Sequence, residues 1–250
     1  MKVLTTILIG ACLLCAVLLL NLCFGGETTK VANSGEVSFY LVPLVCGAAP
    51  QIGCGGRSKP ILLSLEDNTQ IREAWLNREG TTIAVVWDNN ADATKRDEIA
   101  SSIFKTYELR AEKISGKDHN ALFKNFREGN SWYRGSEVNR LSEEEAATIA
   151  DRLTQSIASK VTLPEDKIKF LKSDIAQVLK GRFTQDKASA EVWKNTEKRG
   201  QYKQHLEEEL LEVGKKHLDE NGLNVMKNGF STMYTSQSEE KKSKSCCEKH

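Results

Sequence analysis

The 250-residue chain has few cysteines, almost no net charge and no proline after Pro164. Its seven cysteines are too few for a disulfide-stapled scaffold, in which their share exceeds ~8%. Thirty-five Lys and Arg against 34 Asp and Glu leave a net charge of +1, which argues against a strongly basic nucleic-acid-binding surface. The lack of proline in the last third of the chain allows long helices there.

The chain also lacks the short motifs that mark common enzyme classes. It contains no Gly-x-Ser-x-Gly nucleophile elbow, no Walker loop, no Rossmann glycine fingerprint and no His-Glu-x-x-His zinc motif. Hydrophobic residues make up 40% and charged residues 28% of the chain, as in folded proteins. We therefore expect a folded, non-enzymatic protein that does not bind nucleic acid.

A long uncharged segment lies at the N-terminus. Residues 3–24 carry no charged side chain, and a helix of this length spans about 33 Å, enough for a bilayer core of ~30 Å. A secretory signal has a shorter apolar region of about 7–15 residues, so the segment predicts a transmembrane signal anchor over 1–26. Lys2 is the single charge before the span and favours a main body outside the cytoplasm, in the cell envelope. Cleavage near Gly25-Gly26, which would make the protein secreted, and lipidation at Cys12 are the alternatives.

A glycine- and threonine-rich linker at 27–35 leads into a segment with mixed strand and helix patterns. The clearest strand is the β-branched run Thr81–Asp88, and the clearest helix face is formed by Ile99, Ile103 and Tyr107. The expected elements, in order, are a strand at 36–46, a Gly/Cys loop at 47–60, a helix at 61–68, extended segments at 71–77 and 81–88, a helix at 95–109 and a strand at 109–114. This order predicts an α+β fold in which residues 36–115 form a ferredoxin-like βαββαβ domain.

A connecting segment at 116–140 and a mainly helical region at 141–222 are expected to follow, with a flexible tail at 223–250. The first helix of this region is predicted to begin at Ser142, because Ser142 and Glu145 have the spacing of a capping box. The next is predicted to begin at Thr162–Glu165 and to stop near Gly181. This region is a candidate surface for a protein partner.

The segment 36–114 resembles the heavy-metal-associated domain of soft-metal chaperones and pumps. In that family a Cys-x-x-Cys loop follows the first strand, and an Ala-x-Val-Asn strand comes later. Ile71–Asn77 falls where the Ala-x-Val-Asn strand is expected, and Thr82–Trp87 falls on the next strand. Counting back, the family's cysteine loop falls on Cys54-Gly55-Gly56-Arg57, so Arg57 stands in place of the second cysteine. The resemblance implies a ferredoxin-like fold and binding of a soft metal ion.

Cys46 supplies a second sulfur near Cys54. The two cysteines are separated by a glycine-rich loop that is able to fold back on itself, and a pair of thiolates suits copper, zinc or mercury. Arg57 is expected to lower the pKa of a nearby thiol by its positive charge. A disulfide or redox pair between Cys46 and Cys54 is the equally weighted alternative.

A second cluster lies at the C-terminus, where Cys246, Cys247 and His250 offer soft ligands within five residues. The preferred hypothesis is a single-pass, membrane-anchored protein that binds or hands over a soft metal through Cys46 and Cys54, with the tail cluster as an auxiliary site. The rivals are a thiol-disulfide redox protein of the cell envelope and a non-catalytic interaction protein with a structural disulfide.

Overall fold

The computed structural model describes residues 35–129, 131–184 and 191–244. The chain divides into two compact units, residues 1–33 and 34–250, and every described residue belongs to the second. The anchor predicted at 1–26 and nearly all of the predicted linker lie outside the described residues. Within the described ranges, no helix combines the length and the apolar character needed to cross a bilayer.

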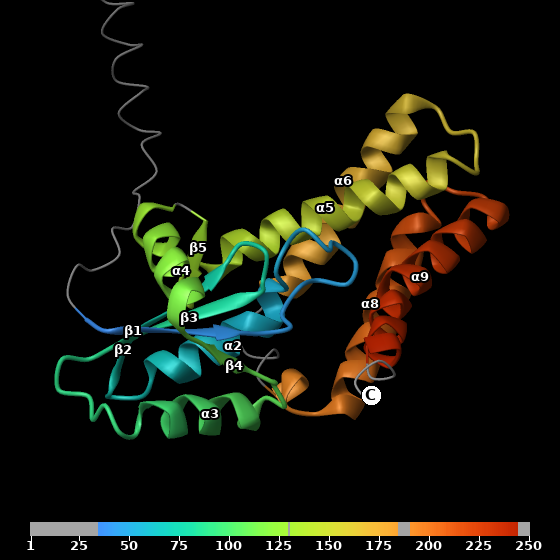
Figure 1. Cartoon of the computed structure of the whole chain (residues 1–250). Helices are drawn as coiled ribbons and strands as arrows, with labels where there is room; N and C mark the ends of the chain where they lie inside the picture. Colours follow the sequence, from blue (N-terminus) through green and yellow to red (C-terminus); the bar gives the residue numbers. More distant parts are fainter. Residues whose placement is uncertain (1–34, 130, 185–190, 245–250) are drawn as a thin grey trace, which may run out of the picture. The chain divides into compact units, whose positions relative to one another are not determined.

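The fold is α+β, as predicted, and is built around one five-stranded antiparallel sheet (Figure 1). The strands lie in the order β4-β1-β3-β2-β5. Val86 opposite Val37 fixes the register of the central pair, and Phe39 opposite Ile114 fixes the register of the β4 edge. The strands are β1 (Val37–Leu41), β2 (Ile71–Asn77), β3 (Thr82–Trp87), β4 (Glu112–Ile114) and β5 (Trp132–Arg134).

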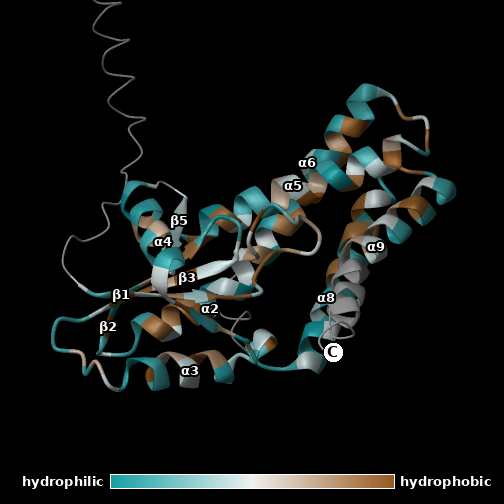
Figure 2. Cartoon of the chain, in the orientation of Figure 1, coloured by the Kyte–Doolittle hydropathy of each residue, from teal (hydrophilic) through white to brown (hydrophobic). Residues whose placement is uncertain are grey.

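Helices cover both faces of the sheet and continue into a helical half (Figure 1). Helices α2 and α3 lie on one face, and α4 lies on the other. Figure 2 shows hydrophobic residues along the strands and α2, whereas α4 is mostly hydrophilic. The named helices are α2 (Gly55–Glu66), α3 (Arg96–Thr106), α4 (Gly116–Glu128), α5 (Val138–Ala158), α6 (Glu165–Phe183), α8 (Thr196–Gly214) and α9 (Glu220–Lys244).

Alternation along the strands separates the side chains of the two faces. On the α4 face, Phe126 makes edge contacts with the rings of Phe39, Trp75 and Trp132, at centroid distances of 5.9, 5.9 and 5.0 Å. The opposite face forms what we call the sheet core, because successive strand residues point to opposite faces. Its buried members include Tyr40, Leu44, Ile61, Leu62, Leu65, Leu76, Val85, Trp87 and Phe104.

A second core joins the helices α5, α6, α8 and α9, and we call it the helix core. Each helix contributes apolar residues at spacings of three and four, the pattern of a buried helix face. Cys46 also belongs to it, which places the loop after β1 against the helical half. Its buried members include Cys46, Ala48, Ala49, Ile149, Leu153, Leu171, Ile175, Leu179, Leu206, Leu210, Met226 and Phe230.

Two predicted helix starts are wrong. The helix expected at 61–68 begins six residues earlier, at Gly55, so residues 55–60 of the predicted Gly/Cys loop are helical and Pro60 lies inside the helix. The helix expected to begin at Ser142 begins at Val138 instead. Ser142 and Glu145 are therefore interior residues of α5, where both are buried, and they do not form a capping box.

The C-terminal half also departs from the prediction. The connecting segment expected at 116–140 contains α4 and β5, and β5 adds a fifth strand to the sheet. Gly181 does not end α6, which continues to Phe183. The tail expected to be flexible from residue 223 is helical through Lys244, and Met226 and Phe230 anchor it in the helix core.

A glycine pair holds the loop after β1 against the β2–β3 turn. Gly80 has a φ of +74°, a conformation that L-residues with side chains rarely adopt. A Cβ at Gly80 would lie 2.5 Å from the Cα of Gly53 and 2.6 Å from the Leu44 carbonyl oxygen. The Gly53 amide donates to the Arg78 carbonyl at 2.7 Å. The position of the loop therefore depends on the absence of side chains at Gly53 and Gly80.

We predict that Gly80→Ala destabilises the protein by about 1–3 kcal/mol, because backbone strain adds to a steric clash. The matched control is Gly181→Ala in α6, where an added Cβ meets no atom within 4 Å. This control is expected to stabilise by about 0.5–1 kcal/mol, as replacement of a helical glycine does. Thermal unfolding measures both. Equal effects of the two substitutions would contradict the proposed packing of Gly80 on Gly53.

Candidate thiol site

Cys46 and Cys54 lie on the two arms of a short hairpin between β1 and α2. Val45 pairs with Gly53 in an antiparallel bridge. The Cys46 amide donates to the Ile52 carbonyl at 2.8 Å, and the Cys54 amide donates to the Leu44 carbonyl at 2.7 Å. With Val45 opposite Gly53, the two cysteines occupy diagonal positions on one face of the hairpin. The predicted folding back of the loop is confirmed, and both cysteines are free thiols.

Cys54 is also the N-cap residue of α2. The Ser58 amide donates to the Cys54 carbonyl at 3.0 Å and the Ser58 hydroxyl donates to it at 2.6 Å. The positive end of the helix dipole therefore points toward the Cys54 side chain. Arg57, in the first turn, donates through Nη1 to the Pro43 carbonyl at 3.2 Å, so its guanidinium is tied back over the loop.

Glu145 of α5 lies beside both cysteines. Its Oε2 accepts the Gly55 backbone amide at 2.9 Å, and its charge raises the pKa of the Cys46 thiol and of the Cys54 thiol. The residue is 2% exposed. A carboxyl group from one half of the chain is thus enclosed by the hairpin and the helix N-terminus of the other half, ninety residues away in sequence.

Burial dominates the protonation of this site. It raises the pKa of the Glu145 carboxyl to about 7, and hydrogen bonds from Cys46, Gly55 and Cys54 hold it from rising further. Burial also raises the thiol pKa values of Cys46 and Cys54, and the charge of Glu145 raises both further. The backbone amide and the charge of Arg57 lower the Cys54 pKa, in the direction predicted, but burial outweighs them. Both cysteines are therefore protonated thiols at neutral pH.

Residues of the helical half close the site. Arg152 of α5 donates to the Ala48 carbonyl at the tip of the hairpin. Burial, and then the charges of Cys54 and Glu145, raise the pKa of Tyr202 of α8. The same hydroxyl donates to the Arg182 carbonyl at 3.4 Å. The thiol site is thus enclosed between the hairpin and three helices, α2, α5 and α8.

The sequence pointed to Cys46 and Cys54, which the hairpin places on one face, but it gave no indication of Glu145. That residue lies four positions before Ile149, on the apolar stripe of α5, and a carboxyl on such a stripe was the available signal. In the part of the chain that the structure describes, no group of three or more His, Cys, Asp or Glu side chains is arranged to hold a metal ion. The predicted tail ligands Cys246, Cys247 and His250 lie outside the described residues.

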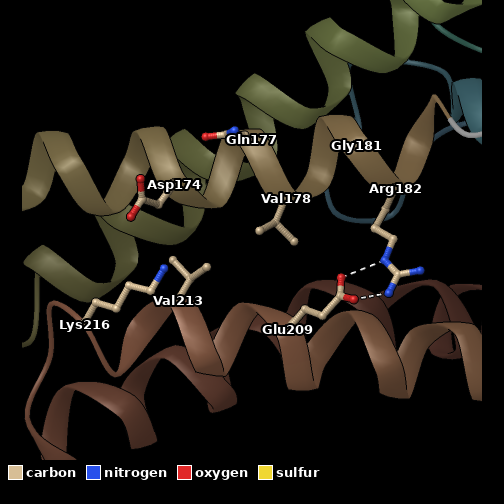
Figure 3. A pocket seen from close by; sticks show the side chains of 8 residues that line it. All are labelled: Asp174, Gln177, Val178, Gly181, Arg182, Glu209, Val213 and Lys216. Carbon is tan, nitrogen blue, oxygen red and sulfur yellow. Dashed lines mark hydrogen bonds and ion pairs between the residues drawn. The ribbon is translucent and has the colours of Figure 1, made fainter.

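A groove of about 570 Å³ lies apart from the thiol site, between α6 and α8 (Figure 3). Val178 and Val213 point into it from the two helices. One end is closed by an ion pair, in which Arg182 Nε donates to Glu209 Oε2 at 2.7 Å. Asp174 and Lys216 line the other end. No cysteine lines this groove, so it belongs to a different part of the molecule from the sulfur pair.

Comparison of the chain with protein-family models, with curated proteins and with solved structures finds no match.

We predict that Glu145 makes stability depend on pH. The native carboxyl keeps its proton up to about pH 7, whereas the ordinary value for the unfolded chain is 4.5. The folded state therefore binds more protons between these values, so stability falls as the pH rises through this window and levels off above it. The substitution Glu145→Gln removes the titrating proton. As the pH rises across the window, the free energy of unfolding of the wild type should therefore fall relative to that of the variant by on the order of 3 kcal/mol.

Denaturant unfolding of the two proteins from pH 4 to pH 9 measures this difference. Glu144→Gln is the matched control, since Glu144 lies one residue away but is paired with Arg78 at the surface, at 3.0 Å. If the free energies of unfolding of the wild type and of Glu145→Gln differ by the same amount at every pH, the buried carboxyl is not the titrating group.

Proposed function

We propose that this protein binds a soft metal ion through the thiolates of Cys46 and Cys54, and that it holds or hands over this ion without catalysing a reaction. The observation that carries the proposal is the hairpin, which places Cys46 and Cys54 on one face beside the buried side chain of Glu145. Two cysteines on one face of a short hairpin are able to direct their sulfurs at one ion, which replaces the two thiol protons. Thiolate ligands select soft ions such as Cu(I), Zn(II) and Hg(II).

The hairpin register favours a bridging ion over a disulfide. Diagonal positions in an antiparallel pair have Cα atoms roughly 7–8 Å apart, beyond the ~4.4–6.8 Å usual for disulfide-bonded residues. Two metal–sulfur bonds of ~2.3 Å allow the sulfurs to lie up to about 4.6 Å apart, whereas a disulfide brings them to about 2.05 Å. The close packing of Gly53 on Gly80 opposes the backbone shift that a disulfide requires.

The number of ligands favours ions that accept two. Structural zinc takes four ligands, whereas the hairpin offers the two thiolates of Cys46 and Cys54. Cu(I) and Hg(II) form stable two-coordinate complexes with a pair of thiolates. Their binding must displace both thiol protons, so the apparent affinity is expected to rise with pH. The helix dipole of α2 and the charge of Arg57 favour the thiolate at Cys54 and so assist this step.

The fold supports the same proposal. Four of the strands lie in the order β4-β1-β3-β2, and α2 and α3 connect them as β-α-β-β-α-β. We propose that this unit is a ferredoxin-like domain of the heavy-metal-associated type. In this account β5 and the helical half are additions, and the second motif cysteine is replaced in space by Cys46. An anchor at 1–26 would place the domain at a membrane surface, outside the cytoplasm, and the helical half would meet a protein partner.

A thiol-disulfide activity is less well supported. The attacking group in such chemistry is a thiolate, and reactive cysteines have lowered pKa values. Burial raises the pKa of both Cys46 and Cys54. A structural disulfide, the third hypothesis, would require the backbone shift that the packing of Gly53 on Gly80 opposes.

The test is a titration of reduced, full-length protein with Cu(I) and with Hg(II). To isolate the pair, five cysteines are replaced by serine, and we call this form the two-cysteine protein; they are Cys12, Cys15, Cys23, Cys246 and Cys247. We predict one ion per chain, with the ultraviolet sulfur-to-metal band of two thiolates. Cys46→Ser and Cys54→Ser should each abolish this band.

Two outcomes would contradict the proposal. The two-cysteine protein could bind no ion, or Cys46→Ser could leave the titration unchanged. Restoring Cys246 and Cys247 to the two-cysteine protein tests the auxiliary site separately, since a second equivalent should then appear and should be lost in His250→Ala.

A further inference from the structure

The C-terminus of α3 holds a glutamate in a backbone conformation that usually belongs to glycine. Glu108 has a φ of +50°, and no other non-glycine residue among those described has a positive φ. Its amide donates to the Lys105 carbonyl at 3.0 Å, and the Leu109 amide donates to the Phe104 carbonyl at 3.0 Å. These two bonds form a Schellman motif, in which glycine is usual at the left-handed position. A strained conformation that persists at this residue suggests a role for its side chain.

The side chain of Glu108 binds the first turn of α8, which lies beside the end of α3 (Figure 1). Arg199 Nη2 donates to Glu108 Oε2 at 2.9 Å, and the Thr196 hydroxyl donates to the same oxygen at 3.4 Å. Arg199 Nη2 also donates to the Thr196 hydroxyl oxygen at 2.7 Å. Thr196 is the first residue of α8, so the carboxylate lies at the positive end of the helix dipole. Glu108 therefore joins the end of α3 to the start of α8.

The segment held in this way, residues 193–202, is called the cover below. Its start lies against the C-terminal part of α2. The Lys194 ammonium lies over the Tyr107 ring at 5.7 Å, and the Tyr107 hydroxyl shares a hydrogen bond of 2.5 Å with the Ser64 hydroxyl of α2. Arg199 ties this start to α8, because its Nη1 donates to the Trp193 carbonyl at 2.8 Å.

The end of the cover lies near the N-terminus of α2, where Cys54 is the N-cap residue. The Tyr202 hydroxyl donates to the Arg182 carbonyl at 3.4 Å. The next carbonyl along the chain, that of Phe183, would lie 3.6 Å from a Cβ built on Gly56 in the first turn of α2. Tyr202 and Cys54 also pack against the same helix core. The cover therefore lies along α2 from its last turns to its first, on the side of Cys54.

We propose that Glu108 and Arg199 form a latch that controls the access of solutes to Cys54. While the pair is closed, the cover stays on α2 and shields the thiol; when the pair breaks, the cover lifts and the thiol becomes accessible. The strain at Glu108 fits this role, because glycine would relieve it but would supply no carboxylate. The side chains of Glu108 and Arg199 are 54% and 26% exposed, so the pair is weak enough to open reversibly. The inference concerns access to the thiol and does not require that an ion binds there.

The test is the rate at which iodoacetamide alkylates Cys54 in the reduced, metal-free, full-length protein, followed by mass spectrometry. We expect Glu108→Gly to raise this rate about 5-fold, because loss of the pair shifts the opening equilibrium of the cover by that factor. Hydrogen exchange of the backbone amides of residues 197–202 should accelerate similarly. The thermal midpoint should stay equal or rise, since glycine adopts the left-handed conformation without strain.

Two controls separate the latch from a general loosening of the surface. Glu112→Ala removes another exposed carboxylate that is paired with an arginine, Arg110, at 2.7 Å, but it lies on β4 and holds no part of the cover. This substitution should change neither rate. Glu108→Arg places like charges together and should raise the alkylation rate further, whereas its combination with Arg199→Glu should return the rate toward that of the wild type.

Each other outcome overturns the inference. An unchanged alkylation rate in Glu108→Gly shows that the pair does not control access. Faster alkylation with unchanged hydrogen exchange shows that the lost charge acts on the thiol without movement of the cover. Faster alkylation with a lowered thermal midpoint shows a general loosening. Failure of the reversed pair to restore the rate shows that the two residues do not act together. The metal titration is a separate measurement, so its failure would refute the proposed function and leave the latch standing.

Discussion

The contact between the Glu145 carboxyl and the N-terminus of α2 joins the two halves of the described chain. The sheet core and the helix core are separate clusters, and this carboxyl reaches from α5 to the Gly55 amide, beside the two cysteines. A buried carboxyl is costly unless it is hydrogen-bonded or protonated, so the site requires the Gly55 amide to stay in place. The hairpin, the glycine pair Gly53–Gly80 and the start of α2 supply the geometry that holds this amide.

Local pattern was sufficient for several elements of the fold. The strand at Thr82–Trp87 was predictable because a β-branched run is bounded by turn residues, and the apolar face of the helix at 96–106 shows clear helical spacing. Helix α2 was placed too late because Gly55, Gly56 and Pro60 are typical of loops. Pro60 is tolerated in the second turn because tertiary packing on β2 and α5 outweighs its local effect. Helix α9 was missed because its few apolar residues contact a core formed by distant segments.

The thiol site shows the same division between local and long-range information. Cys46 and Cys54 are eight residues apart across a glycine-rich loop, so their approach was predictable from the sequence. The position of Glu145 was not, since its partner Gly55 is 90 residues away. The spacing of Ser142 and Glu145 led to a capping-box interpretation for their own helix. In the structure Glu145 does accept a helix-terminal amide, but the amide belongs to α2. The residue type therefore predicted that a carboxyl accepts an amide at a helix N-terminus, but it did not identify the helix that supplies this amide.

The central claim is that Cys46 and Cys54 act together on one ion beside Glu145. X-ray absorption at the metal edge of the two-cysteine protein, loaded with one equivalent of Hg(II), tests it most directly. The account predicts a first shell of two sulfur atoms, reduced to one in either Cys46→Ser or Cys54→Ser. A first shell with a single sulfur, or with nitrogen and oxygen neighbours only, would contradict it.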